Sequence, residues 1–416
     1  MDLFFVLLIL LVTTRSFGEV AVRLGQPALV GELVAGITLG TIVANYTGLA
    51  PDLSGLEQNP VFGSLTDLGM FFIMLYAGVE LQPSKLIEYS KGAISVAIGG
   101  MVLPMAMGIG LAWVFLPQSD AFLAQSIFLG TALAITAVPA TVRILMDLGK
   151  LESPSGQIIV SAAVFDDILS LVLLTWLTAM IGSNSDIGVS AAGGFEFGAI
   201  LFKVLTFFAI TTVVGLFVFP FGGKFMRAIQ QKEYEFTALL VGALAFSVLA
   251  EMLELHFIIG AFIAGLFFDR KTIDESAYDA VLEKTSAMTY GFLAPIFFAS
   301  VGLNLDLSAL FNVPIFVLCL LVVAFAGKFL GAGLAAYWVG LSKREAAAVG
   351  AGMSARGAVE LVIADIALKA GLFDNLIETS PVVEHIFSAV VIMAVVTTLV
   401  TPALLKRIYA GPKQAS

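Results

Sequence analysis

Charged residues are scarce in this 416-residue sequence: Lys, Arg, Asp and Glu together make up 12% of it, while 59% of its residues are hydrophobic. A soluble globular domain has about a quarter charged residues. The composition therefore excludes a large soluble core. The mean hydropathy of +1.01 and the 40 glycines are typical of a polytopic membrane protein, in whose helices glycine is common.

Cysteine and histidine are almost absent. A single cysteine, Cys319, excludes an intramolecular disulfide framework and a cysteine-based metal cluster. The two histidines, His256 and His385, lie at the ends of apolar runs, where we interpret them as structural. The sequence contains no phosphate-binding G-x-x-x-x-G-K-[ST] loop, no H-E-x-x-H zinc motif, no G-x-S-x-G motif and no TVGYG-type filter. We therefore expect that the protein is not an enzyme and binds no cofactor. The net charge of −10 does not suggest a nucleic-acid partner.

Long apolar runs fill the chain instead. Because a membrane-spanning helix needs about 20 apolar residues, the sequence predicts an all-α fold of about thirteen spans in a lipid bilayer. The first run, "MDLFFVLLILLVTT", has no basic region and no cleavage site, so we interpret it as a retained helix. The predicted spans are 3–22, 27–44, 62–81, 92–116, 121–147, 153–181, 198–222, 233–252, 256–269, 285–303, 312–341, 344–369 and 381–405.

Lys and Arg gather at the odd-numbered connections between these spans, and the even-numbered connections have almost none. Arg15 and Arg23 flank the first connection, Lys343 and Arg344 form the eleventh, and Lys406 begins a basic segment after the last span. Cytoplasmic connections carry the positive charge. We therefore expect a multi-pass protein of the inner (plasma) membrane, with its N-terminus outside and its C-terminus in the cytoplasm.

Two pairs of segments resemble each other at nearly the same offset. "PALVGELVAGI" (27–37) matches "HFIIGAFIAGL" (256–266), and "AGVELQPSKL" (77–86) matches "VGLNLDLSAL" (301–310). The offsets are seven spans, an odd number, so the two copies would cross the membrane in opposite directions. Such inverted repeats are typical of transporters, although chance similarity among Gly/Ala-rich helices is an alternative. The predicted organisation is a first repeat at 1–181, a linker helix within 182–232, a second repeat at 233–410 and a cytoplasmic tail at 411–416.

Charged residues occur at bilayer depth in three of the spans. They are Asp166, Asp167, Lys328 and Arg356, with Glu360 four residues after Arg356. Each would cost about 2.5–3.5 kcal/mol at a helix centre, so an ion or proton pathway is the first interpretation. Adjacent aspartates point about 100° apart on a helix, so one can pair with Lys328 while the other binds a proton or a hard monovalent cation. The alternative is a static salt bridge, and for Arg356 with Glu360 that alternative is at least as good.

Two spans are expected to be broken near their centres. "ALAITAVPATVRIL" (132–145) contains a proline that frees a backbone carbonyl, and "GAGMSARGAVELVIA" (350–364) is rich in glycine. Broken helices supply carbonyl groups and dipole ends to ion sites, although a plain kink is an alternative for each. The residues at the two expected breaks are Thr136, Ala137, Val138 and Pro139, and Ser354 and Arg356.

Six segments resemble the monovalent cation:proton antiporter-2 family. They are "TAVPATVRILMDLGKL", "AAVFDDILSL", "HFIIGAFIAGLFF", "FLAPIFFASVGLNLDLSAL", "GKFLGA" and "GAGMSARGAVELVIADIALKAG". The similarity extends over about residues 20–405 and is greatest to the NapA-type two-aspartate sodium/proton exchangers. The resemblance implies a homodimer with inverted repeats, two crossed broken helices and an elevator-like movement of one domain. It also implies that Asp167 binds the cation (Na⁺) and the proton, that Asp166 pairs with Lys328, and that exchange is electrogenic.

The function expected from this resemblance is antiport of cytoplasmic Na⁺, or Li⁺ or K⁺, against external H⁺. Two departures leave a K⁺/H⁺ antiporter as the alternative: the family's Arg-Gly-Glu is "RGAVEL" here, with its acid at Glu360, and "AVPATVRIL" is similar to exchangers that handle potassium. A second alternative is an organic-anion/sodium symporter on a similar fold, which would not need Asp166 and Lys328 at mid-membrane. A cation channel is disfavoured because no filter sequence is present.

Overall fold

The computed structural model describes most of the chain, and every regular element in the described part is helical. The prediction of an all-α fold is thus confirmed for these residues. The side chains of some helical residues, Asp167 among them, lie outside the described part. The described residues are 3–45, 56, 59–80, 90–119, 121–136, 141, 145, 150, 153–182, 202–217, 233–253, 255–268, 275–373 and 380–410.

The chain forms two compact units that interleave along the sequence. Unit 1 comprises Met1–Ser84 and Val189–Asn304, and unit 2 comprises Lys85–Gly188 and Leu305–Ser416. Each unit therefore combines a segment from the first half of the chain with one from the second half. The division into sequence repeats at 1–181 and 233–410 is a different partition, and it stays a prediction.

Unit 1 is an assembly of apolar helices. Near its end, α12, a π-helical turn and α13 follow one another without a break, although the sequence predicted that this span would begin only at 285. The helix begins earlier because Tyr278 is buried and its hydroxyl donates a hydrogen bond of 2.6 Å to the carbonyl of Val79 on α3. The helices of unit 1 are α1 (Leu3–Arg23), α2 (Ala28–Asn45), α3 (Pro60–Glu80), Phe202–Phe217, α10 (Glu233–Met252), α11 (Phe257–Phe267), α12 (Glu275–Met288), η3 (Thr289–Leu293) and α13 (Ala294–Leu303).

Glycines let the helices of unit 1 approach closely. A Cβ atom on Gly31 of α2 would overlap the backbone of α1, and one on Gly260 of α11 would overlap the backbone of α10. A Cβ on Gly36 would likewise overlap α13, and one on Gly265 would overlap α3. These are the positions that the two matching sequence segments align, so aligned glycines make corresponding contacts.

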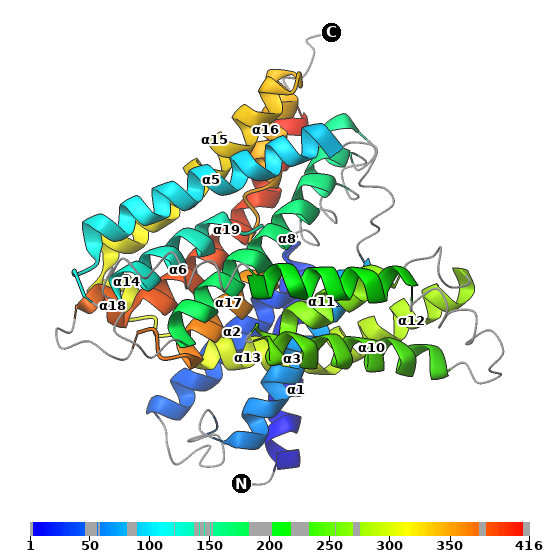
Figure 1. Ribbon diagram of the computed structural model, residues 1–416. Helices are drawn as coiled ribbons and strands as arrows, with labels where there is room; N and C mark the ends of the chain where they lie inside the picture. Colours follow the sequence, from blue (N-terminus) through cyan, green and yellow to red (C-terminus); the bar gives the residue numbers. More distant parts are fainter. Residues whose placement is uncertain are drawn as a thin grey trace. The chain divides into compact units, whose positions relative to one another are not determined.

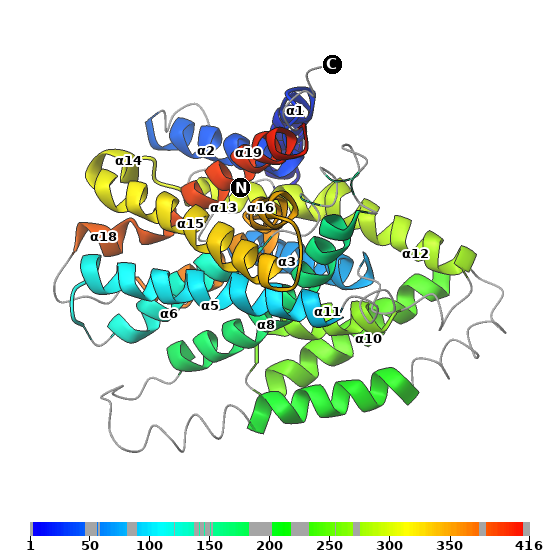
Figure 2. The ribbon, with the colours of Figure 1, turned by 90° about the horizontal axis from the view of Figure 1, so that it is seen from above.

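Unit 2 contains every charged residue predicted at bilayer depth. Its helices α5 and α15 lie side by side, as Figures 1 and 2 both show, with Gly99 against Gly331 and Gly327 against Pro104. The helices of unit 2 are α5 (Ser90–Phe115), α6 (Phe122–Ala134), α8 (Pro154–Gly182), α14 (Ala309–Asn312), α15 (Pro314–Trp338), α16 (Lys343–Gly352), α17 (Ala358–Lys369), α18 (Pro381–Glu384) and α19 (Ile386–Ala410).

The turn between α15 and α16 shows how local sequence sets helix boundaries. Gly340 follows α15 with a φ of 103°, a left-handed conformation that favours glycine. Ser342 then caps α16, and its side chain exchanges hydrogen bonds with Glu345 in a capping box. This turn fixes where α16 begins, ten residues before the chain becomes irregular.

Length and composition support a membrane location. Within the described residues, seven helices are long and apolar enough to cross a membrane, and four shorter helices are also apolar. Exposed apolar side chains, such as Val102 and Val114 on α5 and Leu318 and Val322 on α15, are consistent with lipid contact. The predicted number of thirteen spans stays a prediction.

Candidate functional site

The centre of unit 2 contains a fully buried ion pair. Nζ of Lys328, on α15, lies 3.0 Å from Oδ2 of Asp166, on α8, and both side chains are 0% exposed. The structure thus brings together the two residues that the sequence suggested as partners, although 162 positions separate them. The second oxygen, Oδ1 of Asp166, is buried and accepts no hydrogen bond from the described residues.

Asp167 follows Asp166 on α8. Its backbone lies in the helix, about 100° around the axis from its neighbour. Its side chain lies outside the described part of the structure, so its predicted role as the cation- and proton-binding residue stays a prediction.

The predicted interruption of the twelfth span is present. Helix α16 ends at Gly352 and α17 begins at Ala358, and the five residues between them are irregular and buried. In the fifth span, α6 ends at Ala134 and Ile135 is extended, with a ψ of 151°. Ala137, Val138 and Pro139 lie outside the described residues, so the predicted crossing of two broken helices stays a prediction.

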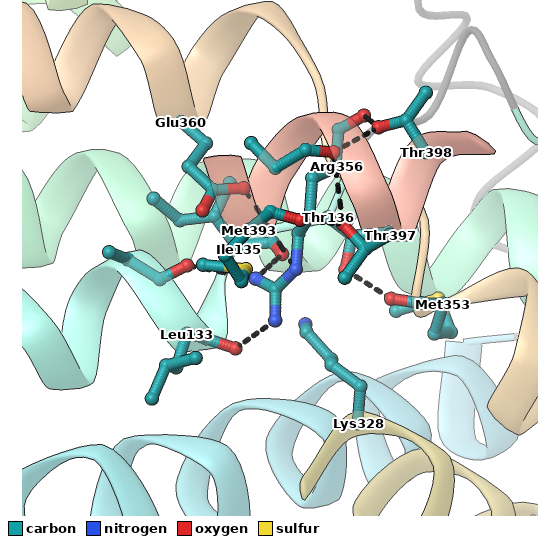
Figure 3. Close-up of polar contacts among 12 residues, drawn as sticks. Leu133, Ile135, Thr136, Lys328, Met353, Arg356, Glu360, Met393, Thr397 and Thr398 are labelled. Carbon is teal, nitrogen blue, oxygen red and sulfur yellow. Dashed lines mark hydrogen bonds and ion pairs between the residues drawn. The ribbon is translucent and has the colours of Figure 1, made fainter. Parts of the chain in front are cut away.

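Arg356, from the irregular segment, binds the C-terminal end of α6. Its guanidinium donates hydrogen bonds to the carbonyls of Ala132 (2.9 Å), Leu133 (2.5 Å) and Ile135. Figure 3 shows the guanidinium directed at this end of the helix, with the ammonium of Lys328 pointing toward it from another helix. The last carbonyls of a helix lack partners within the helix and carry partial negative charge. A buried cation therefore both caps α6 and compensates its dipole.

Hydroxyl groups that follow α6 in turn cap the C-terminal end of α16. The hydroxyl of Thr136 donates to the carbonyl of Met353 (3.2 Å), and that of Thr141 donates to the carbonyl of Gly352 (2.7 Å). These two carbonyls lie at the C-terminal end of α16, where no intrahelical donor remains. Side chains that follow α6 and α16 thus satisfy backbone carbonyls at the end of the other helix.

Two further hydroxyls support the irregular segment around Arg356. Thr398 of α19 donates to the carbonyl of Arg356 (2.7 Å), and Ser354 donates to the carbonyl of Gly350 (2.8 Å). The sequence predicted Ser354 at the break but not Thr398. The feature of the sequence that could have indicated Thr398 is the polar pair Thr397–Thr398 inside an otherwise apolar span.

The expected ion pair between Arg356 and Glu360 is loose. Nε of Arg356 and Oε2 of Glu360 are 3.9 Å apart, with both side chains 0% exposed. That Nε atom and both carboxyl oxygens of Glu360 are buried without a hydrogen-bond partner among the described residues. Arg356 is thus bonded to α6 rather than to Glu360.

Two acids and two cations therefore share one buried region of unit 2: Asp166, Lys328, Arg356 and Glu360. The formal charges of these four side chains cancel when all of them are ionised. No group of three or more His, Cys, Asp or Glu side chains suited to a metal ion occurs among the described residues. The available donors are carboxylate and carbonyl oxygens, which suit hard cations and protons.

Comparison with known proteins identifies the family. The model of the transmembrane sodium/hydrogen exchanger family matches residues 6–410 of this chain. Because that match covers nearly the whole sequence, the protein belongs to this family.

Two relatives match along nearly their whole length. The chain is 30% identical to the Na⁺/H⁺-K⁺ antiporter GerN of Bacillus cereus, a similarity that covers 100% of this chain and 98% of GerN. It is 31% identical to the Na⁺/H⁺ antiporter NhaS4 of Synechocystis, covering 98% of this chain and 97% of that protein. Its fold is similar to that of the sodium proton antiporter MjNhaP1 from Methanocaldococcus jannaschii, with a TM-score of 0.69 and 20% identity over 97% of this chain and 96% of that one.

Proposed function

We propose that this protein is a secondary-active antiporter that exchanges a monovalent cation, Na⁺ in the first place, for H⁺ across a membrane. The observation that carries the proposal is the fully buried Asp166–Lys328 pair, next in sequence to a second aspartate. A protein that only needed to join α8 to α15 would not require charges there, since a buried ion pair is often no more stable than apolar residues of the same volume.

The site supplies what exchange requires. Asp167 is proposed to bind the cation and the proton alternately, because a carboxylate can hold only one of the two ligands at a time. Asp166 and Lys328 are proposed as its charge partners, and Oδ1 of Asp166 is an additional acceptor. The electrogenic form of the mechanism follows if Lys328 or Asp166 also releases a proton during the cycle.

An inverted-repeat, elevator-type mechanism is part of the proposal. Corresponding glycines of the two matching segments make corresponding close contacts, Gly31 with α1 and Gly260 with α10, which supports two copies of one structural repeat. Every charged residue of the site belongs to unit 2. In an elevator-type cycle, unit 2 would carry the bound ion as one body.

The finer assignments are proposals as well: membership of the cation:proton antiporter-2 branch, a homodimer in the plasma membrane, an outside N-terminus and a function other than that of an enzyme. Potassium is the alternative cargo. It is favoured by the "RGAVEL" sequence, in which the acid lies at Glu360, and by the name of GerN, a Na⁺/H⁺-K⁺ antiporter.

Transport in proteoliposomes tests the proposal. A proton gradient is imposed across vesicles containing a pH-sensitive dye, and Na⁺, Li⁺ or K⁺ is then added to wild type and to Asp167→Asn. Cation-triggered collapse of the gradient in wild type, and not in Asp167→Asn, is the expected result, and it ranks the cations. The absence of cation-dependent proton movement by well-folded wild-type protein would refute antiport.

A further inference from the structure

Glu360 is the one acid of the buried cluster to which the proposed exchange assigns no function. It lies in the first turn of α17, its side chain is 0% exposed, and neither carboxyl oxygen has a hydrogen-bond partner among the described residues. The nearest cationic atom, Nε of Arg356, is 3.9 Å away, which is beyond hydrogen-bonding distance. An ionised carboxylate without donors is far more costly in such a place than a protonated one.

Arg356 lies between two competing acceptors. Its two terminal nitrogens donate to the carbonyls of Ala132, Leu133 and Ile135 at the end of α6, and its Nε has no hydrogen-bond partner in the described structure. A guanidinium binds a carboxylate best through two parallel hydrogen bonds. Because Nε lies 3.9 Å from Oε2 of Glu360, such a bond to an ionised Glu360 would require the guanidinium to move about 1 Å toward the carboxylate. That movement would stretch its hydrogen bonds to the end of α6.

The other charges around Glu360 are few. Lys328 on α15 acts on it electrostatically and is itself paired with Asp166 on α8. Of the helices packed against α17, α6 has no ionisable side chain, and those of α19 are Lys406, Arg407 and Tyr409, all near its C-terminal end. Two cations and the N-terminal end of α17 thus favour the ionised form, while burial without donors favours the protonated form.

We propose that Glu360 is a second proton-binding carboxyl, separate from the Asp166–Asp167 pair, and that its protonation determines how tightly Arg356 holds the end of α6. With a proton on Glu360, Arg356 remains on the carbonyls of Ala132, Leu133 and Ile135. When Glu360 loses its proton to water, its negative charge draws the guanidinium over and releases carbonyl oxygens beside the ion site. Glu360 acts through Arg356 and is therefore a positioning residue. Only the link to ion exchange rests on the proposed function.

Infrared spectroscopy tests proton binding without any need for transport. The band of protonated carboxyl groups is followed while the pH of lipid-reconstituted protein is raised, for wild type, Glu360→Gln and Asp365→Asn. Asp365 is a matched control because it is also buried on α17, but it has a partner, Lys369, at 3.0 Å. We expect wild type and Asp365→Asn to show a titrating component of one carboxyl that Glu360→Gln lacks. Identical titrations of wild type and Glu360→Gln would overturn the proposal.

Two additional measurements complete the test. Glu360→Asp keeps a carboxyl on a shorter side chain, so its component should persist and titrate at a different pH, and an unchanged titration would contradict the assignment even if Glu360→Gln did not fold. In proteoliposomes, competition at Asp167 leaves the apparent KM for the cation pH-dependent in every variant, but in Glu360→Gln this dependence should become weaker than in wild type over the range where the component titrates, and Glu360→Asp should restore it. A KM profile of Glu360→Gln equal to that of wild type would overturn the link to Arg356. Absence of antiport by wild type, with the infrared component present, would refute the proposed function and not the proton site.

Discussion

The ion pair between Asp166 and Lys328 makes a quantitative prediction about stability. Lys328→Gln leaves a carboxylate that is 0% exposed without the cation that lies 3.0 Å from it. Removal of one partner of a buried pair costs about 3–5 kcal/mol, because the remaining charge is uncompensated. Replacement of both partners, in Asp166→Asn/Lys328→Gln, leaves two neutral amides that can bond each other, so the double variant should unfold with nearly the free energy of wild type.

The chain offers a matched control for this double-mutant cycle. Lys369 and Asp365 form a pair with the same 3.0 Å separation, but the Lys369 side chain is 42% exposed. Exposed pairs contribute only about 0–1 kcal/mol, and solvent reaches the lysine end of this pair although the Asp365 side chain is only 2% exposed. Lys369→Gln should therefore cost clearly less than Lys328→Gln. Burial rather than distance therefore separates the two predictions.

The assay is reversible unfolding by SDS in mixed micelles, followed by tryptophan fluorescence. The three tryptophans, Trp113, Trp176 and Trp338, all lie in helices of unit 2, so the signal reports on the unit that contains the pair. We expect a coupling free energy at the upper end of the range for residues in contact, about 3 kcal/mol or more. Single variants that each cost under about 1 kcal/mol and add in the double variant would refute the reasoning, since that is the behaviour of a solvent-screened pair.

Three other predictions concern the surroundings of the site. Thr398→Val should lower the free energy of unfolding by about 1–3 kcal/mol, because the buried carbonyl that its hydroxyl caps loses its partner; an unchanged value in the same micelle assay would show that the carbonyl finds another donor. Gly350→Ala should lower the free energy of unfolding by about 1–3 kcal/mol because its Cβ would overlap the backbone of α15. Gly110→Ala has open space around its Cβ and should raise that free energy by about 0.5–1 kcal/mol through helix propensity. Equal effects of the two variants would contradict the close packing at Gly350. Between α13 and α14, the hydroxyl of Ser308 holds the pKa of Asp306 below its usual value. A depressed folded-state pKa stabilises the protein above the ordinary Asp pKa of about 4, so the difference in melting temperature between wild type and Asp306→Asn should be present at neutral pH and vanish as the pH falls below that value; a constant difference would refute the assignment.

The sequence indicates the charges of the site and the broken span because charged residues and glycines are recognisable by type within apolar runs. Asp166, Lys328 and Arg356 are conspicuous in apolar runs, and glycines around position 352 predict that a helix ends there. The cost of charge in a bilayer is a general quantity, so residue type alone predicts that these charges have partners. The family resemblance then indicates which residues pair.

The backbone partners of Arg356 could not be predicted in the same way. Every residue has a carbonyl, so nothing in "TALAIT" (131–136) marks Ala132, Leu133 and Ile135 as acceptors until the end of α6 is located. The sequence suggested Glu360 as the partner of Arg356 because i,i+4 side chains are neighbours on a continuous helix. Arg356 precedes α17 rather than lying in it, since the helix begins at Ala358, and the two side chains are therefore only loosely opposed.

The central claim is that a cation and a proton compete for one carboxylate beside the Asp166–Lys328 pair. The direct measurement is proton release from purified, weakly buffered protein on addition of Na⁺ or K⁺, read with a pH-sensitive dye, with choline as the control for ionic strength. The account predicts cation-dependent release from wild type and none from Asp167→Asn, with both proteins folded. Equal release from the two proteins, or no release from wild type at any pH, would contradict it.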